Sequence, residues 1–146
     1  MNFTVDANIF VAASKPNEPF HSACHDFFLK VAKEKGIFEC PNLMLIEIAA
    51  AVARSTHSRL LSQTLLQQTL ATPFLRLRGL DAKLAASSAQ IAATHFLRAA
   101  DAVYVAVARE AKSILITLDK EIRERGGLIV PVLTPQEWLQ STEAKG

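Results

Sequence analysis

The sequence predicts an α/β fold in which helices cover both faces of a parallel sheet. Short apolar runs of strand length alternate with longer helical patterns along the 146 residues. The run at residues 113–117, SILIT, does not alternate between apolar and polar positions, which is typical of a buried parallel strand. The length suits one compact domain, so residues 1–146 are predicted to form a single domain.

The first half of the chain supplies three of the predicted strands. They are expected at residues 3–5, 37–40 and 74–77, and Pro41 closes the second of them. A helix is expected over residues 43–54, because its alanines raise helix propensity. Ser58 is a suitable N-cap for the next helix, at about residues 59–70, and Asp81 begins another helical pattern.

The last third of the chain is predicted to alternate between helices and strands. Residues 102–111 are rich in alanine and valine and predict a buried helix. A short charged helix is expected over residues 119–125, and a strand over residues 128–133. Pro131 cannot donate a ladder hydrogen bond, which favours an edge position for that strand. Thr134, Pro135 and Glu137 form the start of a helix with a capping box.

Composition narrows the class of protein. No apolar stretch is long enough to span a bilayer, and no basic and apolar leader opens the chain, so a cytoplasmic protein is expected. Two cysteines do not indicate a disulfide framework. The net charge of +2 permits nucleic-acid binding without indicating it.

Four acidic residues stand where a solvated surface is not expected. Asp6 and Asp119 follow predicted strands, Asp101 begins a buried helix, and Glu47 lies between Ile46 and Ile48 in an apolar helix. Ligands of open α/β sheets bind outside the carboxyl ends of the strands. Isolated buried carboxylates are costly, and clustered ones repel unless a cation neutralises them. The pattern therefore predicts a Mg²⁺ or Mn²⁺ site.

Each acid also has an ordinary structural interpretation. Asp6 and Asp119 would be suitable N-caps of the helices that follow them. Asp101 would be favourable near the positive end of its helix dipole, and Glu47 could pair with Arg54 or another basic residue.

Four segments of the sequence resemble one family. The segments FTVDANIF, MLIEIAAAVAR, LRAADAVYVAVAREA and ILITLDKEI, followed by VPVLTPQEWL, are similar in order, spacing and apolar context to the PIN-domain ribonucleases. They are most similar to the VapC-type toxins of type II toxin–antitoxin pairs. The resemblance covers nearly the whole chain.

This resemblance implies a fold and a set of site residues. It implies a PIN-like three-layer α/β/α sandwich with a parallel sheet of roughly five strands. The four acids of the family fall on Asp6, Glu47, Asp101 and Asp119, and its small polar residue near the fourth acid falls on Thr117. Asn8 matches a polar residue two positions after the first acid. Ala7 departs from the hydroxyl residue common there, which removes a supporting hydrogen bond but no metal ligand.

The activity implied is metal-dependent hydrolysis of RNA phosphodiester bonds. Asp6, Asp101 and Asp119 would hold the Mg²⁺ or Mn²⁺, while Glu47 would order a second metal ion or a metal-bound water. Asn8 and Thr117 would orient the carboxylates. The basic residues nearest these segments are the candidates for RNA phosphate contacts: Arg54, Arg59, Arg98 and Lys120.

Protein partners are expected as well. The resemblance implies a small antitoxin that covers the acidic site. Two consecutive helices carry more apolar surface than one side of a domain needs, which predicts a homodimer and a nearby groove for the antitoxin. The residues of this surface are Ala49, Ala50, Val52, Ala53, Leu60, Leu61, Leu65 and Leu66.

Other functions fit the sequence less well. A phosphoacceptor receiver domain usually has adjacent acids after its first strand, whereas Val5 and Ala7 flank Asp6. A non-catalytic interaction module would have little reason to keep four acids. RNA processing without a toxin activity stays open. His21, Cys24 and His25 have zinc-ligand spacing, but an ordinary packed helix is favoured there.

Overall fold

The computed structural model describes residues Met1–Gly146 and contains one five-stranded sheet in which all neighbouring strands are parallel. The strand order is β3-β2-β1-β4-β5. The strands are β1 (Asn2–Val5), β2 (Ile37–Pro41), β3 (Leu75–Arg78), β4 (Ile114–Ile116) and β5 (Val132–Leu133). The predicted parallel sheet of five strands is confirmed.

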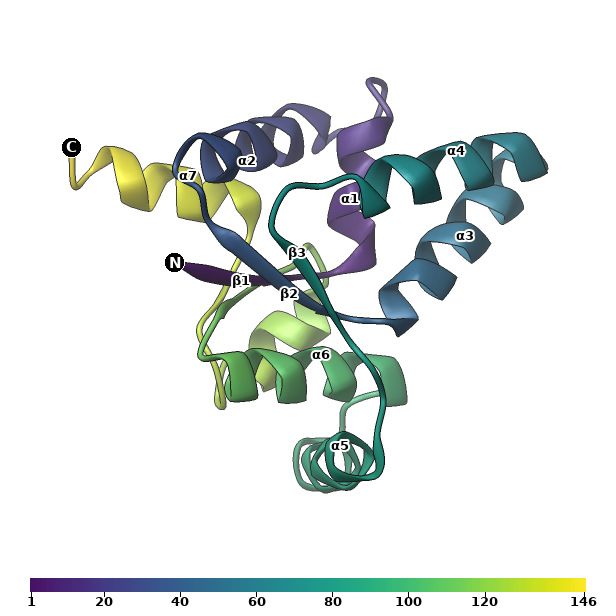
Figure 1. Ribbon diagram of the computed structural model, residues 1–146. Coiled ribbons are helices and arrows are strands. Elements are labelled where there is room, and N and C mark those ends of the chain that lie inside the picture. Colours follow the sequence, from purple (N-terminus) through teal and green to yellow (C-terminus); the bar gives the residue numbers. More distant parts are fainter.

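Helices form a layer on each face of this sheet (Figure 1). The helices are α1 (Ala7–Ser14), α2 (His21–Lys33), α3 (Leu43–Thr56), α4 (Arg59–Leu70), α5 (Ala82–His95), α6 (Ala99–Ala111), the π-helical turn η1 (Ile122–Gly126) and α7 (Pro135–Glu143). In Figure 1, α1 to α4 and α7 lie on one side of the strands, and α5 and α6 lie on the other. The predicted α/β/α sandwich is therefore confirmed.

The core is densest around the central strand β1. The ring of Phe3 meets the rings of Phe27 and Trp138 edge to face, with centroids 5.4 and 5.2 Å apart. On the other face of the sheet, every residue of α6 from Ala102 to Ala108 is buried. Small and β-branched side chains allow this helix to pack on the sheet and on α5 at once, as its composition predicts.

Three of the helix starts predicted from the sequence are confirmed, and each has a capping side chain. Ser58 accepts a hydrogen bond from the backbone of Leu61, and Asp81 accepts one from Leu84. Thr134 and Glu137 form the reciprocal pair of a capping box. Each cap satisfies backbone N–H groups that the helix leaves without partners.

Several element boundaries differ from those predicted. The last strand has only two residues, because the backbones of Ile129 and Val130 both donate to the Gly126 carbonyl and form a turn instead. The strand is an edge strand, as Pro131 predicts. Helix α1 begins at Ala7, directly after Asp6, and α6 begins three residues before the predicted start. The segment after Asp119 becomes helical from Lys120 and ends as η1.

The order of the strands creates a crevice at their carboxyl ends. From β1 the chain continues through α1 and α2 to β2 on one side, whereas β4 pairs with β1 on the other side. The two carboxyl ends are in register, with Val5 beside Ile116. Such a reversal of strand order opens a crevice for ligands.

No single helix is long and apolar enough to cross a membrane. Helices α5 and α6 meet that criterion only together, and they are bent by 114° relative to each other.

Candidate active site

Asp6 lies at the crevice, directly after β1. Its backbone N–H donates to the carbonyl of Ile116 on β4, at 3.0 Å, which extends the β1–β4 pairing by one residue. Asp6 occupies the N-cap position of α1, yet its side chain makes no capping hydrogen bond. Its Oδ2 accepts instead a 2.7 Å hydrogen bond from Oγ1 of Thr117. The carboxylate is thus held toward β4 rather than used as a helix cap.

Thr117 and Asp119 form a second part of the site, after β4. Thr117 is fully buried, and its Oγ1 also accepts a hydrogen bond from the Asp119 backbone at 3.0 Å. Oδ1 of Asp119 accepts from the backbone of Ile122 at 3.0 Å. The structural interpretation of Asp119 as a helix cap therefore holds for one of its oxygens. The same hydrogen bonds fix Asp119 beside Asp6.

Glu47 reaches the site from α3 and is tied to it by Tyr104. The Tyr104 hydroxyl donates to Oε1 of Glu47 at 2.7 Å and accepts from the backbone N–H of Ala7 at 3.3 Å. Glu47 forms no ion pair with Arg54, so the interpretation of the two as an ion pair is wrong. Ile46 is 72% exposed and Ile48 is fully buried, which places Glu47 at the border of the core.

All four predicted acids line one pocket of about 430 Å³. They come from four separate parts of the chain: the end of β1, α3, the first turn of α6 and the segment after β4. The residues that line this acid pocket are Asp6, Ala7, Asn8, Val11, Ala12, Glu18, Phe20, Glu47, Ala51, Arg98, Asp101, Leu118 and Asp119.

The acid pocket raises the pKa of three carboxyl groups. Burial, with the charges of Glu47 and Asp119, raises the pKa of Asp6 to about 6, although the hydrogen bond from Thr117 opposes the shift. Burial and the charges of Asp119 and Asp6 raise the pKa of Asp101 to about 6 as well, against the opposing charge of Arg98. Burial also raises the pKa of Glu47. The pocket therefore contains too little positive charge to stabilise the ionised forms of these carboxyl groups.

Two observations bear on whether a cation fits this pocket. Oδ1 of Asn8, which lines the pocket, is buried and has no hydrogen-bond partner. An amide oxygen among carboxylates is a donor set that Mg²⁺ and Mn²⁺ accept. Yet no three acidic, histidine or cysteine side chains are arranged so that they could hold a metal ion as they stand. The acids share the pocket without converging on one point, and the side-chain oxygen of Asn8 accepts no hydrogen bond.

Of the predicted RNA-contact residues, only Arg98 lines the acid pocket. Its guanidinium lies 3.7 Å from Glu121. Lys120 is exposed next to Asp119 and pairs with Glu124 at 3.8 Å. Arg54 is exposed at the last turn of α3, and Arg59 lines a different groove, between α3 and α4.

Three further residues of the site are not apparent from the sequence: Tyr104, which holds Glu47, and Glu18 and Phe20, which line the pocket. Tyr104 was part of an apolar run and so resembled a core residue, although its position three residues after Asp101 places both on one helix face. Glu18 and Phe20 belong to the connection between α1 and α2, where no periodicity marks them.

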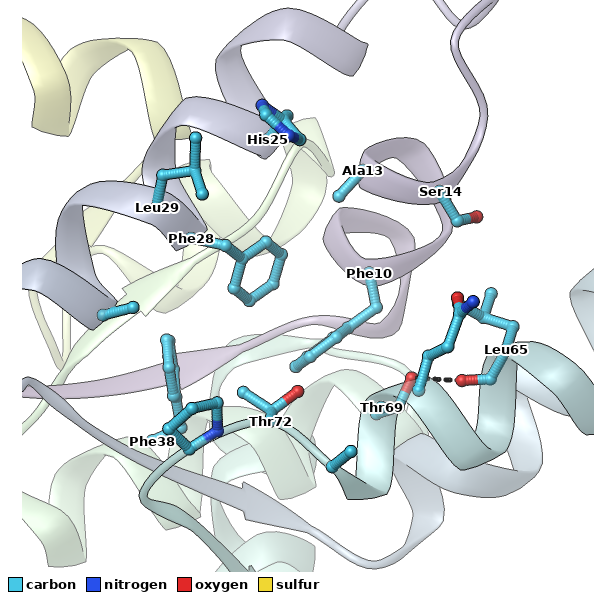
Figure 2. A pocket seen from close by; sticks show the side chains of 14 residues that line it. Phe10, Ala13, Ser14, His25, Phe28, Leu29, Phe38, Leu65, Thr69 and Thr72 are labelled. Carbon is cyan, nitrogen blue, oxygen red and sulfur yellow. Dashed lines mark hydrogen bonds between the residues drawn. The ribbon is translucent and has the colours of Figure 1, made fainter.

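A second pocket, of about 370 Å³, lies between α1, α2 and α4 and contains none of the acids. Figure 2 shows the rings of Phe10 and Phe28 pointing toward each other, with Leu65 and Thr69 of α4 opposite. The centroids of the two rings are 4.8 Å apart. We refer to this cavity as the apolar pocket. His25 is at its edge, while Cys24 is fully buried in the core and His21 Nδ1 lies 3.0 Å from the Ala12 carbonyl oxygen.

The PIN domain family model matches residues 3–128, so the chain belongs to the PIN domain family. No protein of curated function matches the sequence.

Several solved structures have a similar fold. VapBC2 from Rickettsia felis, bound to a DNA fragment from its promoter, is similar with a TM-score of 0.72 and 15% identity, over 92% of this chain and 98% of that one. FitAcB from Neisseria gonorrhoeae is similar with a TM-score of 0.68 and 20% identity, over 92% of this chain and 98% of that one. VapC20 from Mycobacterium tuberculosis, a sarcin-ricin loop cleaving toxin, is similar with a TM-score of 0.69 and 17% identity. The similarity covers 84% of this chain and 93% of that one.

Proposed function

We propose that the protein is a Mg²⁺- or Mn²⁺-dependent endoribonuclease and the toxin of a toxin–antitoxin pair. The observation that carries this proposal is that Asp6, Glu47, Asp101 and Asp119 line the same pocket at the carboxyl ends of the strands. Membership of the PIN domain family supports it, as does the fold shared with a toxin that cleaves the sarcin-ricin loop.

In this proposal Asp6, Asp101 and Asp119 hold the cation. The unpartnered oxygen of Asn8 and the raised pKa values of Asp6 and Asp101 both support a group of opposite charge there. A bound divalent ion would supply a water of lowered pKa and would polarise the scissile phosphate. Small side-chain movements would be needed to bring three ligands onto one ion.

Other residues of the site orient these ligands and the substrate. Thr117 fixes one oxygen of Asp6 and, through the Asp119 backbone, the segment that carries Asp119. Tyr104 holds Glu47 at a defined distance from the start of α1. Arg98 can present its guanidinium to a phosphate, because its only acidic partner is 3.7 Å away.

The proposed partners are an antitoxin and a second copy of the chain. The groove between α3 and α4 is lined by apolar side chains, including Ile46, which is 72% exposed. Leu60 of α4 is also 72% exposed. Val52 and Leu65, predicted to belong to this surface, are buried in the core instead, because they lie on the inward faces of their helices. Light scattering at tens of micromolar protein tests the dimer. The identity of the adjacent open reading frame tests the antitoxin.

The test of the nuclease is cleavage of single-stranded RNA by purified protein in Mg²⁺ or Mn²⁺. Asp6→Asn keeps the size of the side chain and its ability to accept the Thr117 hydrogen bond, but removes the charge. We expect cleavage to fall by orders of magnitude while circular dichroism shows an intact fold. Lys33→Ala, an exposed residue at the end of α2, is the control and should cleave as the wild type does. Wild-type activity in Asp6→Asn would reject the proposed site.

RNA processing without a toxin activity is the alternative that the same chemistry leaves open. The two differ in their effect on a cell, because only a toxin arrests growth when it is expressed without its partner. Expression of the wild type beside Asp6→Asn separates them. A cytoplasmic location is proposed in either case.

A further inference from the structure

The wall of the acid pocket contains an apolar surface that cation binding does not use. Phe20 and Leu118 are the largest apolar side chains of this wall, beside the smaller Val11 and Ala51. A Mg²⁺ site needs only oxygen ligands, so metal binding does not explain why apolar side chains line this pocket.

Phe20 is the most unusual of these residues. It lies just before α2 and is 52% exposed although it lines the pocket. Its ring stacks on no other aromatic ring of the protein, unlike those of Phe3, Phe27 and Phe28. Leaving an aromatic ring in water forgoes hydrophobic stabilisation, which a flat ligand would restore.

Arg98 gives the same pocket a positively charged group. Its side chain is 78% exposed and is held only by the 3.7 Å contact with Glu121. A guanidinium with free donors binds phosphate oxygens. An exposed ring and an exposed guanidinium on one cavity of about 430 Å³ match the base and the phosphate of a nucleotide.

We propose that Phe20 is a stacking platform for the base of one unpaired nucleotide, whose phosphate is held near Arg98 and the acids. Bases stack on aromatic side chains through faces that a duplex already covers, so this platform selects single-stranded RNA. The inference rests on the proposed function and names the part of the substrate that the acid pocket recognises.

The test compares two small probes that share a phosphate and a ribose and differ only in the base. These are adenosine 5′-monophosphate and ribose 5-phosphate, each titrated into the protein with MgCl₂ and followed by NMR. The wild type should bind the nucleotide more tightly, by about 5- to 150-fold. Phe20→Ala should remove this difference, and Phe20→Trp should retain it. Arg98→Ala should weaken both probes equally.

Phe74→Ala is the matched control. Phe74 is 55% exposed, close to the value for Phe20, but it precedes β3 at the amino ends of the strands. This variant should keep the full preference for the nucleotide. Equal binding of the two probes by the wild type, no binding of either at millimolar concentration, or a preference that survives Phe20→Ala would each overturn the inference. None of these outcomes depends on RNA cleavage, which tests the proposed function separately.

Discussion

The acid pocket and the apolar pocket have similar volumes, about 430 and 370 Å³, but they are built on opposite principles. The apolar pocket is lined by residues such as Phe38 and Leu65, whose burial stabilises the fold. The acid pocket is lined by carboxylates whose pKa values are raised, which shows that their ionised forms are destabilised there. The residues that stabilise the fold and those proposed for catalysis therefore lie in different pockets. Substitutions in the acid pocket should lower activity and spare stability, and those in the apolar pocket should do the reverse.

The largest expected effect is that of Asp101→Asn on activity. The Asp101 side chain lies in the first turn of α6 and has no ion-pair or hydrogen-bond partner that the substitution would remove. We expect RNA cleavage to fall by at least about 10²-fold, since the charge that holds the cation is lost. Single-turnover cleavage rates measure this. Loss of activity through unfolding of the variant would contradict the claim that the acid pocket serves activity rather than stability.

The opposite change is Phe38→Ala in the apolar pocket. Phe38 is almost fully buried and packs against the rings of Phe3, Phe27 and Phe28. Its truncation should lower the free energy of unfolding by about 3–5 kcal/mol, measured by urea denaturation. Below its unfolding temperature, the variant should bind Mn²⁺ as tightly as the wild type does. A loss of Mn²⁺ affinity in the folded variant would show that the two pockets are coupled.

Asp6→Asn should raise stability in the absence of metal, and the gain should depend on pH. The folded protein holds the Asp6 proton up to about pH 6, whereas the unfolded chain releases it near 3.8. Between these values the folded state binds more protons, so its stability falls as pH rises. Because asparagine does not ionise, Asp6→Asn removes this loss and should raise the free energy of unfolding at pH 7 by on the order of 2–3 kcal/mol.

Near pH 4 the gain from Asp6→Asn should disappear. Urea denaturation in EDTA at both pH values measures it. Asp101→Asn should behave in the same direction but more weakly, because that side chain is more exposed and solvent screens its charge. Equal effects at pH 4 and pH 7 would contradict the assignment of the raised pKa to Asp6.

The smallest expected effect is that of Tyr104→Phe. The variant loses a hydroxyl that bridges Glu47 and the Ala7 backbone, and should be less stable by about 1–2 kcal/mol. Because Glu47 would no longer be held, Mn²⁺ affinity should also fall several-fold. In a Glu47→Gln background the loss of affinity should shrink, which a double-mutant cycle measures. Additive effects would show that the hydroxyl acts only on stability.

The difference between the two pockets also explains what the sequence could predict. Asp6 and Asp119 are recognisable because a carboxylate after an apolar strand breaks the local pattern, and Thr134 and Glu137 because a capping box has a fixed spacing. The apolar pocket gave no such signal, since Phe10 and Phe28 obey the helical pattern of core residues. Tyr104 was hidden for the same reason.

The end of the sheet was predicted less well because its limits depend on tertiary contacts. An apolar run predicts a strand over residues 128–133, but the backbone pairs with β4 only from Pro131 onward, where the Pro131 carbonyl accepts from the Leu115 backbone. Hydrogen bonds to Gly126 hold the earlier residues in a turn. Hydrophobic periodicity alone does not predict the outcome of such competition between a turn and a strand.

The most direct test of the account is the binding of Mn²⁺ to the protein without RNA, measured by calorimetry at neutral pH. The wild type and Lys33→Ala should bind the ion with micromolar to millimolar affinity, and saturation should raise the melting temperature. Asp6→Asn should show neither the heat of binding nor the rise in melting temperature, although it is folded. A wild type that takes up no Mn²⁺ at millimolar concentration, or an Asp6→Asn variant that binds as the wild type does, would contradict the claim that the acid pocket is a metal site.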